Sequence, residues 1–115
     1  GFFAGRLRAA QEHGIAKERL CFDPGVGFGK AYEENLALIA QVGKTRIPGV
    51  AYLMAASRKR VTGRPCGDPP FSERLPATIA AHTVALMGGA DILRVHDVAE
   101  SVQAARMAAA LRSVC

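Results

Sequence analysis

Three short apolar runs divide the chain, and each is followed by a turn and then by apolar residues at helical spacing. The runs occupy residues 19–22, 50–54 and 92–95. They are continuous rather than alternating, which is typical of strands that are buried on both faces of a parallel sheet. The pattern therefore predicts three parallel strands, each followed by a helix.

Apolar stripes at intervals of three and four residues predict the helices. One stripe precedes the first strand and ends at His13-Gly14, the next ends at Gly43, and a third ends at Gly88-Gly89, all good glycine stops. The stripe residues are Phe2, Phe3 and Leu7; Tyr32, Leu36, Ile39 and Val42; Leu75, Ile79, Leu86 and Met87; and Val98, Val102, Ala105 and Ala109. The predicted order is one helix and then three strand–helix units, with residues 63–70 as a long loop.

The spacing of the strands favours a barrel. Strand starts lie about 30 and about 40 residues apart, close to the roughly 31 residues per unit of a (β/α)8 barrel. Three parallel strands cannot close a barrel or hide both sheet edges. We expect an α/β fold, a partial TIM (β/α)8 barrel made of its last three βα units plus a preceding helix; a small open sheet is the alternative. The chain opens on Gly1 inside a helical pattern, so we expect residues 1–115 to be the C-terminal part of a longer barrel domain.

Composition narrows the choice of partner and location. The net charge of +5 and pI near 9.6 suit an anionic partner, either nucleic acid or a phosphorylated small molecule. Cys21, Cys66 and Cys115 lack metal-site spacing and are interpreted as reduced thiols of a cytoplasmic protein. Neither a membrane span nor a secretory signal is predicted.

The glycine-rich stretch FDPGVGFGK, residues 22–30, resembles a nucleotide cradle but does not fit one. In a phosphate-binding P-loop, Pro24 would have to be glycine and Ala31 would have to carry a hydroxyl. In a dinucleotide fingerprint, Lys30 would have to be glycine. The stretch is instead a strand-to-helix turn with a different chemistry.

Polar residues follow each predicted strand at the end where barrel active sites lie. Asp23 follows the first, and two readings stay open: a brace for the Pro24-Gly25 turn, or an acceptor for the paired donors of a pterin or purine ring. Phe28 is either a core plug or a wall for such a ring. The glycines around it let a ligand approach the backbone.

The other two strands lead into basic residues. Ser57 is a reasonable helix N-cap, and Lys59 and Arg60 would then lie in the first turn of that helix. The helix dipole disfavours cations in a first turn, so their presence there suggests a bound anion. A solvated basic loop is the alternative. Arg94 and His96 are two apart, so a strand would project them to one face.

Short-range sequence patterns guide the interpretation of Asp97, Glu100 and the histidines inside predicted helices. Asp97 with Glu100 is interpreted as a capping box for the last helix. His13 and His82 lie inside helical segments and receive no functional role.

Three motifs in this order, FDPGVGFGK, ASRKR and RVHDV, resemble the dihydropteroate synthase family, over essentially all 115 residues. The resemblance implies a soluble enzyme of folate biosynthesis that is the target of sulfonamides. It condenses 6-hydroxymethyl-7,8-dihydropterin pyrophosphate with p-aminobenzoate to give 7,8-dihydropteroate and pyrophosphate. It also implies a homodimeric parent enzyme that uses magnesium, with the magnesium ligand upstream of Gly1 and no metal ligand in this chain. By itself this piece is expected to be inactive.

The resemblance implies roles for the residues that match the family's motifs. Asp23 and Lys59 would bind the pterin, and Phe28, Ser57 and Arg60 would line the p-aminobenzoate pocket. Arg94 and His96 would hold the departing pyrophosphate, where cations stabilise the charge that develops; no catalytic residue is assigned.

Two positions depart from the family pattern. Arg60 stands where many members have serine, and Ala55 stands where glycine is common, which affects the p-aminobenzoate and sulfonamide contacts.

Two other functions remain open. A pterin-binding methyltransferase that uses methyltetrahydrofolate has a related barrel, but a methyl transfer has no pyrophosphate for the RVHDV and SRK residues to hold. A basic nucleic-acid-binding module is the other, but the five Phe and two Tyr are not interleaved with the basic loop.

Overall fold

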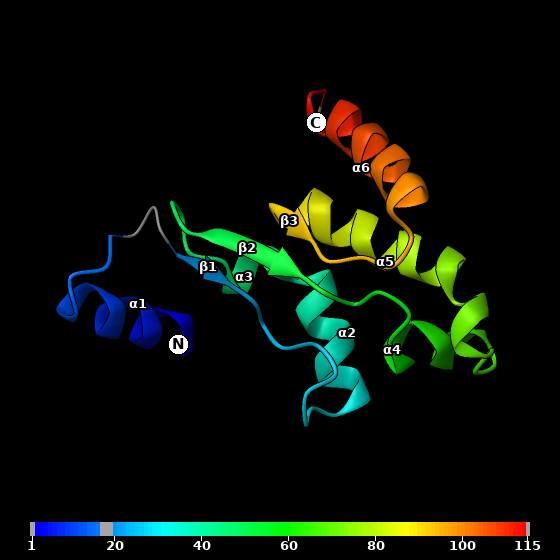
Figure 1. The fold of residues 1–115 in the computed structure, drawn as a ribbon, viewed down its shortest axis with the longest axis horizontal. Helices are drawn as coiled ribbons and strands as arrows, with labels where there is room; N and C mark the ends of the chain where they lie inside the picture. Colours follow the sequence, from blue (N-terminus) through cyan, green and yellow to red (C-terminus); the bar gives the residue numbers. More distant parts are fainter. Residues whose placement is uncertain (1, 17–19, 115) are drawn as a thin grey trace.

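The computed structural model describes residues 2–16 and 20–114, and it has an α/β fold. Figure 1 shows three strands side by side, with the first helix at one end and the last helix rising from the other. The elements are α1 (Phe2–Glu12), β1 (Cys21–Phe22), α2 (Tyr32–Ala40), α3 (Val42–Thr45), β2 (Ala51–Met54), α4 (Arg60–Gly63), the 3-10 turns η2 (Arg64–Cys66) and η3 (Phe71–Glu73), α5 (Leu75–Gly88), β3 (Ile92–Leu93) and α6 (Val98–Arg112). The predicted order of one helix and three strand–helix units is confirmed.

The sheet is parallel, in the order β1-β2-β3. Cys21 pairs with Ala51 at the start of the first ladder, and Leu53 pairs with Ile92 at the start of the second. Asp91 strengthens the second ladder, because its N–H donates to the Tyr52 carbonyl at 2.8 Å and its carboxylate accepts from the Tyr52 N–H at 2.9 Å. The three strands therefore all run in one direction, and their carboxyl ends lie along one edge.

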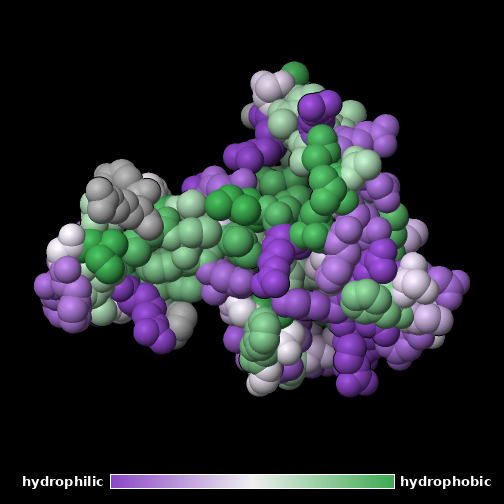
Figure 2. Space-filling model, viewed as in Figure 1, coloured by the Kyte–Doolittle hydropathy of each residue, from purple (hydrophilic) through white to green (hydrophobic). Residues whose placement is uncertain are grey.

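The central strand shows how the sheet is buried. Tyr52 and Met54 are fully buried on one face of β2, whereas Ala51 and Leu53 on the opposite face are only partly covered. Phe3 of α1 contacts the ring of Tyr52 edge to face, with centroids 5.7 Å apart. The buried core contains Phe3, Val26, Ile39, Val42, Tyr52, Met54, Ala56, Val61, Ala85 and Ala90. Figure 2 shows that apolar residues also gather on the surface over the sheet and beside α6.

Several predicted boundaries need correction. The strands are shorter than expected, since β1 begins at Cys21 and β3 ends at Leu93; Arg19 lies outside the described residues. The stripe that was expected to run to Gly43 breaks at Gln41, so that Val42 begins a separate short helix. The expected loop over residues 63–70 is partly helical, because α4 and η2 extend to Cys66.

The predicted glycine stops and free thiols agree with the structure. α5 ends at Gly88 and is followed by Gly89, whose φ of 114° is left-handed, and Gly14 after α1 has φ 79°. Cys21 and Cys66 are free thiols, and Cys115 lies outside the described residues. Across the described ranges, no helix combines the length and apolar character needed to cross a bilayer.

Candidate functional site

The loop after β1 is shaped by three glycines in left-handed conformations. Gly25, Gly27 and Gly29 have φ values of 75°, 86° and 68°, which residues with a β-carbon rarely adopt. Asp23 accepts a hydrogen bond of 2.8 Å from the Gly25 N–H. The brace role of Asp23 is therefore present, and it uses one of the two carboxylate oxygens.

Two side chains from other elements hold this glycine loop in place. Asn35, buried on α2, accepts a 2.9 Å hydrogen bond from the Gly27 N–H. Lys59 donates a 2.6 Å hydrogen bond from Nζ to the Val26 carbonyl. Our sequence reasoning missed Asn35; the available signal was an amide within the apolar stripe of α2, where a polar group needs a partner.

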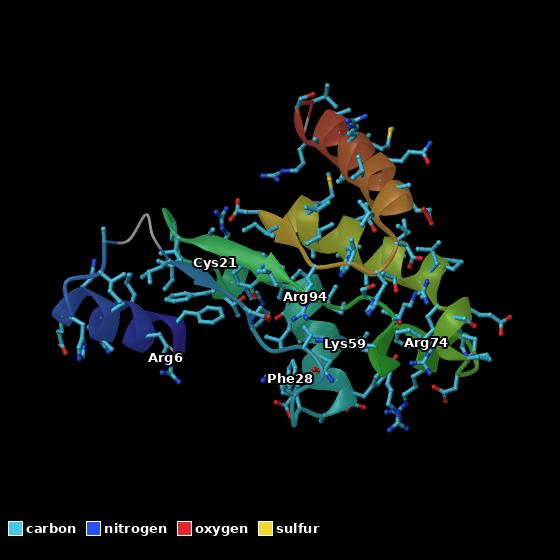
Figure 3. All side chains as sticks on the ribbon, viewed as in Figure 1. Arg6, Cys21, Phe28, Lys59, Arg74 and Arg94 are labelled. Carbon is cyan, nitrogen blue, oxygen red and sulfur yellow. The ribbon has the colours of Figure 1, made fainter. Side chains whose placement is uncertain are left out.

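Phe28 lies at the tip of the loop and is 71% exposed, so the interpretation as a core plug is wrong. Its ring centre is 4.8 Å from the Lys59 ammonium, within the range of a cation–π contact. Figure 3 shows Phe28, Lys59 and Arg94 in the same region of the molecule, beyond the ends of the strands. An exposed ring beside a cation is available to a planar ligand.

Burial lowers the pKa of Lys59, and the positive charge of Arg94 lowers it further, while the negative charge of Asp23 opposes both. Asp23, Lys59 and Arg94 follow β1, β2 and β3 respectively, so the charges that act on Lys59 come from the ends of the other two strands. The carboxyl ends of the three strands thus bring Asp23, Lys59 and Arg94 into one neighbourhood, as the sequence predicted.

Ser57 is buried and does not cap a helix, which corrects the N-cap prediction. The N-cap of α4 is Lys59, and Ser57 instead lies against His96. The Ser57 Oγ is 2.7 Å from His96 Nδ1 and accepts a 3.2 Å hydrogen bond from the His96 N–H. Because this oxygen accepts from the backbone, its own proton can be donated to Nδ1, which leaves Nε2 of the neutral ring as the donor.

Asp97 does not form the predicted capping box with Glu100. It is the N-cap residue of α6, but its side chain makes no cap hydrogen bond. Its carboxylate instead binds Arg58, with Oδ2 3.0 Å from Nε and Oδ1 2.6 Å from Nη2. This paired contact lowers the pKa of Asp97 and raises that of Arg58. The two-point ion pair is stronger than a backbone cap, which explains why the local rule failed.

Arg94 and His96 lie beyond β3, so they do not share a face by strand alternation as predicted. The Arg94 N–H still bonds to the Met54 carbonyl at 3.0 Å, which extends the pairing one residue past the strand. Arg94 is exposed in this chain. His96 contacts the ring of Phe71 edge to face, with centroids 5.3 Å apart.

A cavity of about 790 Å³ lies between the glycine loop and the segment after β2. Arg64 on its wall stacks over Tyr32, with the guanidinium 4.2 Å from the ring centre. Of the predicted site residues, Phe28, Lys59 and Arg60 line it, whereas Ser57 lies away from its wall. The lining residues are Val26, Gly27, Phe28, Lys30, Tyr32, Asn35, Arg58, Lys59, Arg60, Val61, Arg64, Asp68, Phe71 and Arg74. Six cations and one carboxylate make this cavity suited to an anionic aromatic ligand.

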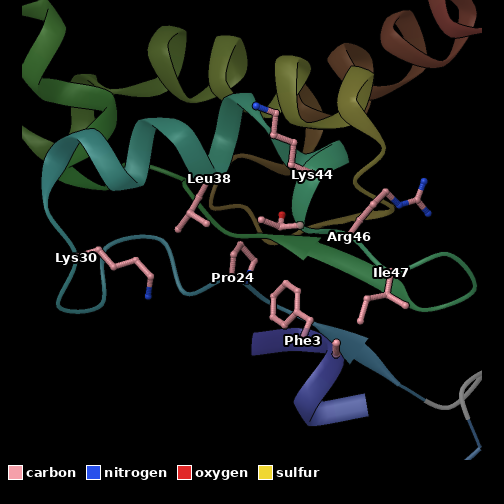
Figure 4. A pocket seen from close by; sticks show the side chains of 9 residues that line it. Phe3, Pro24, Lys30, Leu38, Lys44, Arg46 and Ile47 are labelled. Atoms are coloured by element: carbon pink, nitrogen blue, oxygen red, sulfur yellow. The ribbon is translucent and has the colours of Figure 1, made fainter. Parts of the chain in front are cut away.

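A second cavity, of about 550 Å³, contains none of the predicted site residues. Figure 4 shows it between α1 and the segment that enters β2, with Phe3, Leu38, Lys44 and Arg46 around it. Because it lies away from the loops that follow β2 and β3, we assign it no part in the site.

His82 has a structural role that the sequence analysis did not assign. It is buried on α5, and its Nε2 accepts a 3.0 Å hydrogen bond from the Ala56 N–H. Burial, together with the charge of Lys59, lowers its pKa to about 4. His82 is therefore neutral near pH 7 and fixes the backbone directly before Ser57. His13, by contrast, is exposed, as expected for a surface residue.

The described residues contain no group of three His, Cys, Asp or Glu side chains that could hold a metal ion. Within the described residues, the donor set therefore offers magnesium no three-ligand cluster. The magnesium prediction, which placed the ligand upstream, stays a prediction, and no step below is assigned to the metal.

Comparison with known proteins identifies the family. A family model described as pterin binding enzyme matches residues 1–96. The chain belongs to this family. The dihydropteroate synthase of Escherichia coli (strain K12) is 39% identical over 112 residues, which cover 97% of this chain and 39% of that protein. The folate synthesis bifunctional protein of Arabidopsis thaliana is 38% identical, over 92% of this chain and 24% of that protein.

Solved structures of pterin-binding enzymes share the fold of this chain. The Stenotrophomonas maltophilia dihydropteroate synthase with active site-bound imidazole is 43% identical and has a TM-score of 0.91, over 100% of this chain and 43% of that one. A Yersinia pestis enzyme bound to a pterine-sulfa conjugate is 36% identical with a TM-score of 0.92, over 99% of this chain and 45% of that one. The predicted resemblance to dihydropteroate synthase is confirmed, and the chain spans less than half the length of each of these proteins.

Proposed function

We propose that this chain is the C-terminal part of a dihydropteroate synthase. The observation that carries the proposal is the 2.6 Å contact of Lys59 with the Val26 carbonyl of the glycine loop, at the carboxyl ends of parallel strands and beside a basic cavity of about 790 Å³. The complete enzyme would condense 6-hydroxymethyl-7,8-dihydropterin pyrophosphate with p-aminobenzoate. The resemblance of the whole chain to dihydropteroate synthases supports this choice of reaction.

We infer that the three βα units belong to a (β/α)8 barrel. β1 and β3 each pair with β2 alone among the described strands. Ile92 of β3 is 43% exposed, and the face of β2 that carries Ala51 and Leu53 is incompletely covered. Further strands on both sides would pair these edges and fill the interior, as barrel closure requires.

The pterin would bind against Asp23 and Lys59. The second oxygen of Asp23 remains available to accept from the amino and ring N–H groups of the pterin. Lys59 has three donor hydrogens, and the Val26 carbonyl accepts one of them. These two residues would therefore fix the pterin ring in its plane.

The p-aminobenzoate would lie in the basic cavity. Its ring would contact the exposed Phe28, and its carboxylate would meet Arg60 on the cavity wall. Ser57, whose Oγ is engaged with His96, would support this pocket from behind. Ala55 is buried, so of the two departures from the family pattern only Arg60 would touch p-aminobenzoate or a sulfonamide.

The chemistry is a displacement at the methylene carbon of the pterin. The bond from this carbon to the pyrophosphate oxygen breaks as the aromatic amine forms a C–N bond and then loses a proton. Arg94 and the Nε2–H of His96 would stabilise the negative charge that develops on the departing pyrophosphate. The chain's residues therefore bind, orient and stabilise, and none is assigned as a general base.

The rest of the proposal concerns the whole enzyme. We propose a cytoplasmic homodimer that acts on small molecules and not on nucleic acid, with magnesium held by residues outside this chain. The 115 residues alone would form no dihydropteroate, because an open sheet leaves the site accessible to water and provides only part of the ligand contacts.

The test is an assay of the complete protein with both substrates, with product identified by mass spectrometry. We expect dihydropteroate from the complete protein and none from residues 1–115. Methyl transfer from methyltetrahydrofolate in a parallel reaction, without dihydropteroate, would replace the proposal by the methyltransferase alternative. Binding to nucleic acid that falls steeply with salt and ignores pterin would replace it by the nucleic-acid module.

A further inference from the structure

Arg58 has an unusual backbone conformation at the centre of the proposed site. It stands between Ser57 and Lys59, and its φ is 55°, in the left-handed region. A side chain with a β-carbon rarely adopts this conformation, and it persists only where surrounding contacts hold it. The contacts of Arg58 therefore indicate what the conformation is for.

Both backbone groups of Arg58 are bound by neighbouring side chains. Its N–H donates a 2.8 Å hydrogen bond to the hydroxyl of Thr78, which is fully buried on α5. Its carbonyl accepts a 3.1 Å hydrogen bond from Arg74 Nη1, and Arg74 Nε donates to the Pro69 carbonyl at 2.9 Å. The turn is thus fixed from both sides, independently of any ligand.

The side chain of Arg58 is also fully engaged. Its guanidinium makes the two-point contact with Asp97 and lies 5.2 Å from the ring centre of Phe71. Because Asp97 balances its charge, Arg58 differs from the exposed Arg60 and Arg94, whose charges are available to an anion. In the view of Figure 3, the label of Lys59 lies between those of Arg94 and Arg74.

The left-handed turn sends the two neighbouring side chains to different parts of the site. Ser57 points to His96, on the side proposed for pyrophosphate, and Lys59 points to Val26, on the side proposed for pterin. Asp97 follows His96 directly, so the Arg58–Asp97 contact ties the loop after β2 to the loop after β3. A change in this contact would alter the distance between the two halves of the site.

We propose that Arg58 and Asp97 form a positioning clamp, which holds the leaving-group residue His96 in register with the pterin-binding residue Lys59. Each clamp residue acts through its neighbour: Arg58 lines the basic cavity, but its guanidinium is bound to Asp97. The proposal rests on the proposed dihydropteroate synthase activity and names a requirement of that same site.

The experiment compares Asp97→Asn, Arg58→Lys and the double variant in the complete enzyme. Asp97→Asn keeps the size of the side chain and removes its charge, and Arg58→Lys keeps the charge but loses the fork that binds two oxygens. For each single variant we expect pyrophosphate affinity, measured by calorimetry, and kcat both to fall about tenfold, within the range for coupled residues. In Asp97→Asn the KM for p-aminobenzoate should stay within about twofold, and the double variant should be no worse than either single one. Arg112→Lys, on the exposed end of α6, is the matched control and should change nothing.

Three results would overturn the clamp. Unchanged pyrophosphate affinity and kcat in both single variants would mean that the contact positions nothing. A lower unfolding temperature with unchanged kinetics would show that the ion pair only stabilises the fold. Loss of pyrophosphate affinity in Arg58→Lys but not in Asp97→Asn would mean that Arg58 binds the anion itself. If the unaltered enzyme makes no dihydropteroate, the proposed function fails, and the pyrophosphate titrations, which need no turnover, still decide on the clamp.

Discussion

The ammonium group of Lys59 lies 2.6 Å from the backbone carbonyl of Val26, thirty-three residues earlier in the chain. This hydrogen bond joins the loop after β2 to the glycine loop after β1. It places a cation beside an exposed aromatic ring, in the neighbourhood of Asp23 and Arg94. The predictions below test what this arrangement does.

Replacing Asp23 by alanine should weaken binding of the pterin substrate. The carboxylate that would accept from the pterin is lost, and the ring's donors then lack a partner, which costs about 1–3 kcal/mol of binding free energy. Calorimetric titration of the complete enzyme with the pterin pyrophosphate measures this. The control is Glu12→Ala, which removes an exposed carboxylate at the end of α1. Equal affinity in the Asp23 variant and the parent would leave Asp23 as a turn brace only.

Two glycines in the same loop provide a matched pair for Lys59. Alanine at Gly27 or Gly29 carries a similar backbone penalty of about 1–2 kcal/mol, because both have left-handed φ values. A β-carbon at Gly27 would lie 3.2 Å from Lys59 Cδ, whereas at Gly29 it would meet nothing within 4 Å. We expect both variants to unfold at lower urea concentrations than the parent. Only Gly27→Ala should also bind the pterin more weakly. Similar pterin affinities in the two variants would show that the position of Lys59 does not matter for binding.

Much of the fold was predictable because its signals are local. The glycine stops of α1 and α5 and the apolar strands are each encoded within a few residues, and the order of elements follows from them. The ends of the strands were not predictable in this way, because pairing between strands determines them. β3 stops at Leu93, opposite Met54, the last residue of β2. Residue types at strand ends also indicated that Asp23, Lys59 and Arg94 would converge.

The errors in the site come from contacts between distant residues. Ser57 and Asp97 were both assigned helix caps by local rules, yet each is bound by a residue 39 positions away, His96 and Arg58 respectively. Asn35 and His82 accept hydrogen bonds from backbone N–H groups of other loops, a role that no local pattern encodes. Such pairings are determined only when the strands assemble.

Alanine at Arg94 or His96 should weaken pyrophosphate binding more than p-aminobenzoate binding. The positive charge of Arg94 and the ring N–H of His96 lie where the leaving group is expected, and a hydrogen bond to a charged group contributes about 1.5–3 kcal/mol. Titration of each variant with pyrophosphate and with p-aminobenzoate separates the two sites. Arg112→Ala is the control for charge alone. If both ligands weaken equally, these residues do not form a pyrophosphate site.

The buried His82 should make folding stability depend on pH. In the unfolded chain it takes up a proton as pH falls below its ordinary pKa of 6.5, whereas the folded state resists protonation until about 4. Its contribution is complete above pH 6.5 and decreases as pH falls through that window, by at most about 3 kcal/mol. His82→Gln keeps an acceptor for the Ala56 N–H and removes the titration. Urea unfolding at about pH 7 and about pH 4.5 should show a smaller difference in this variant than in the parent. An unaltered difference between the two pH values in His82→Gln would contradict the assignment.

The central claim is that this chain supplies the pterin and pyrophosphate contacts of a dihydropteroate synthase. The most direct test measures dihydropteroate and pyrophosphate together in the complete enzyme, for the parent, Lys59→Met and the control Lys44→Met, which changes a lysine outside the site. The parent and the control should release one pyrophosphate for each dihydropteroate formed. Lys59→Met should lose most of both products, because it removes the donor to the pterin and the tie to the glycine loop. Full activity in Lys59→Met, or no dihydropteroate from the parent, would contradict the claim.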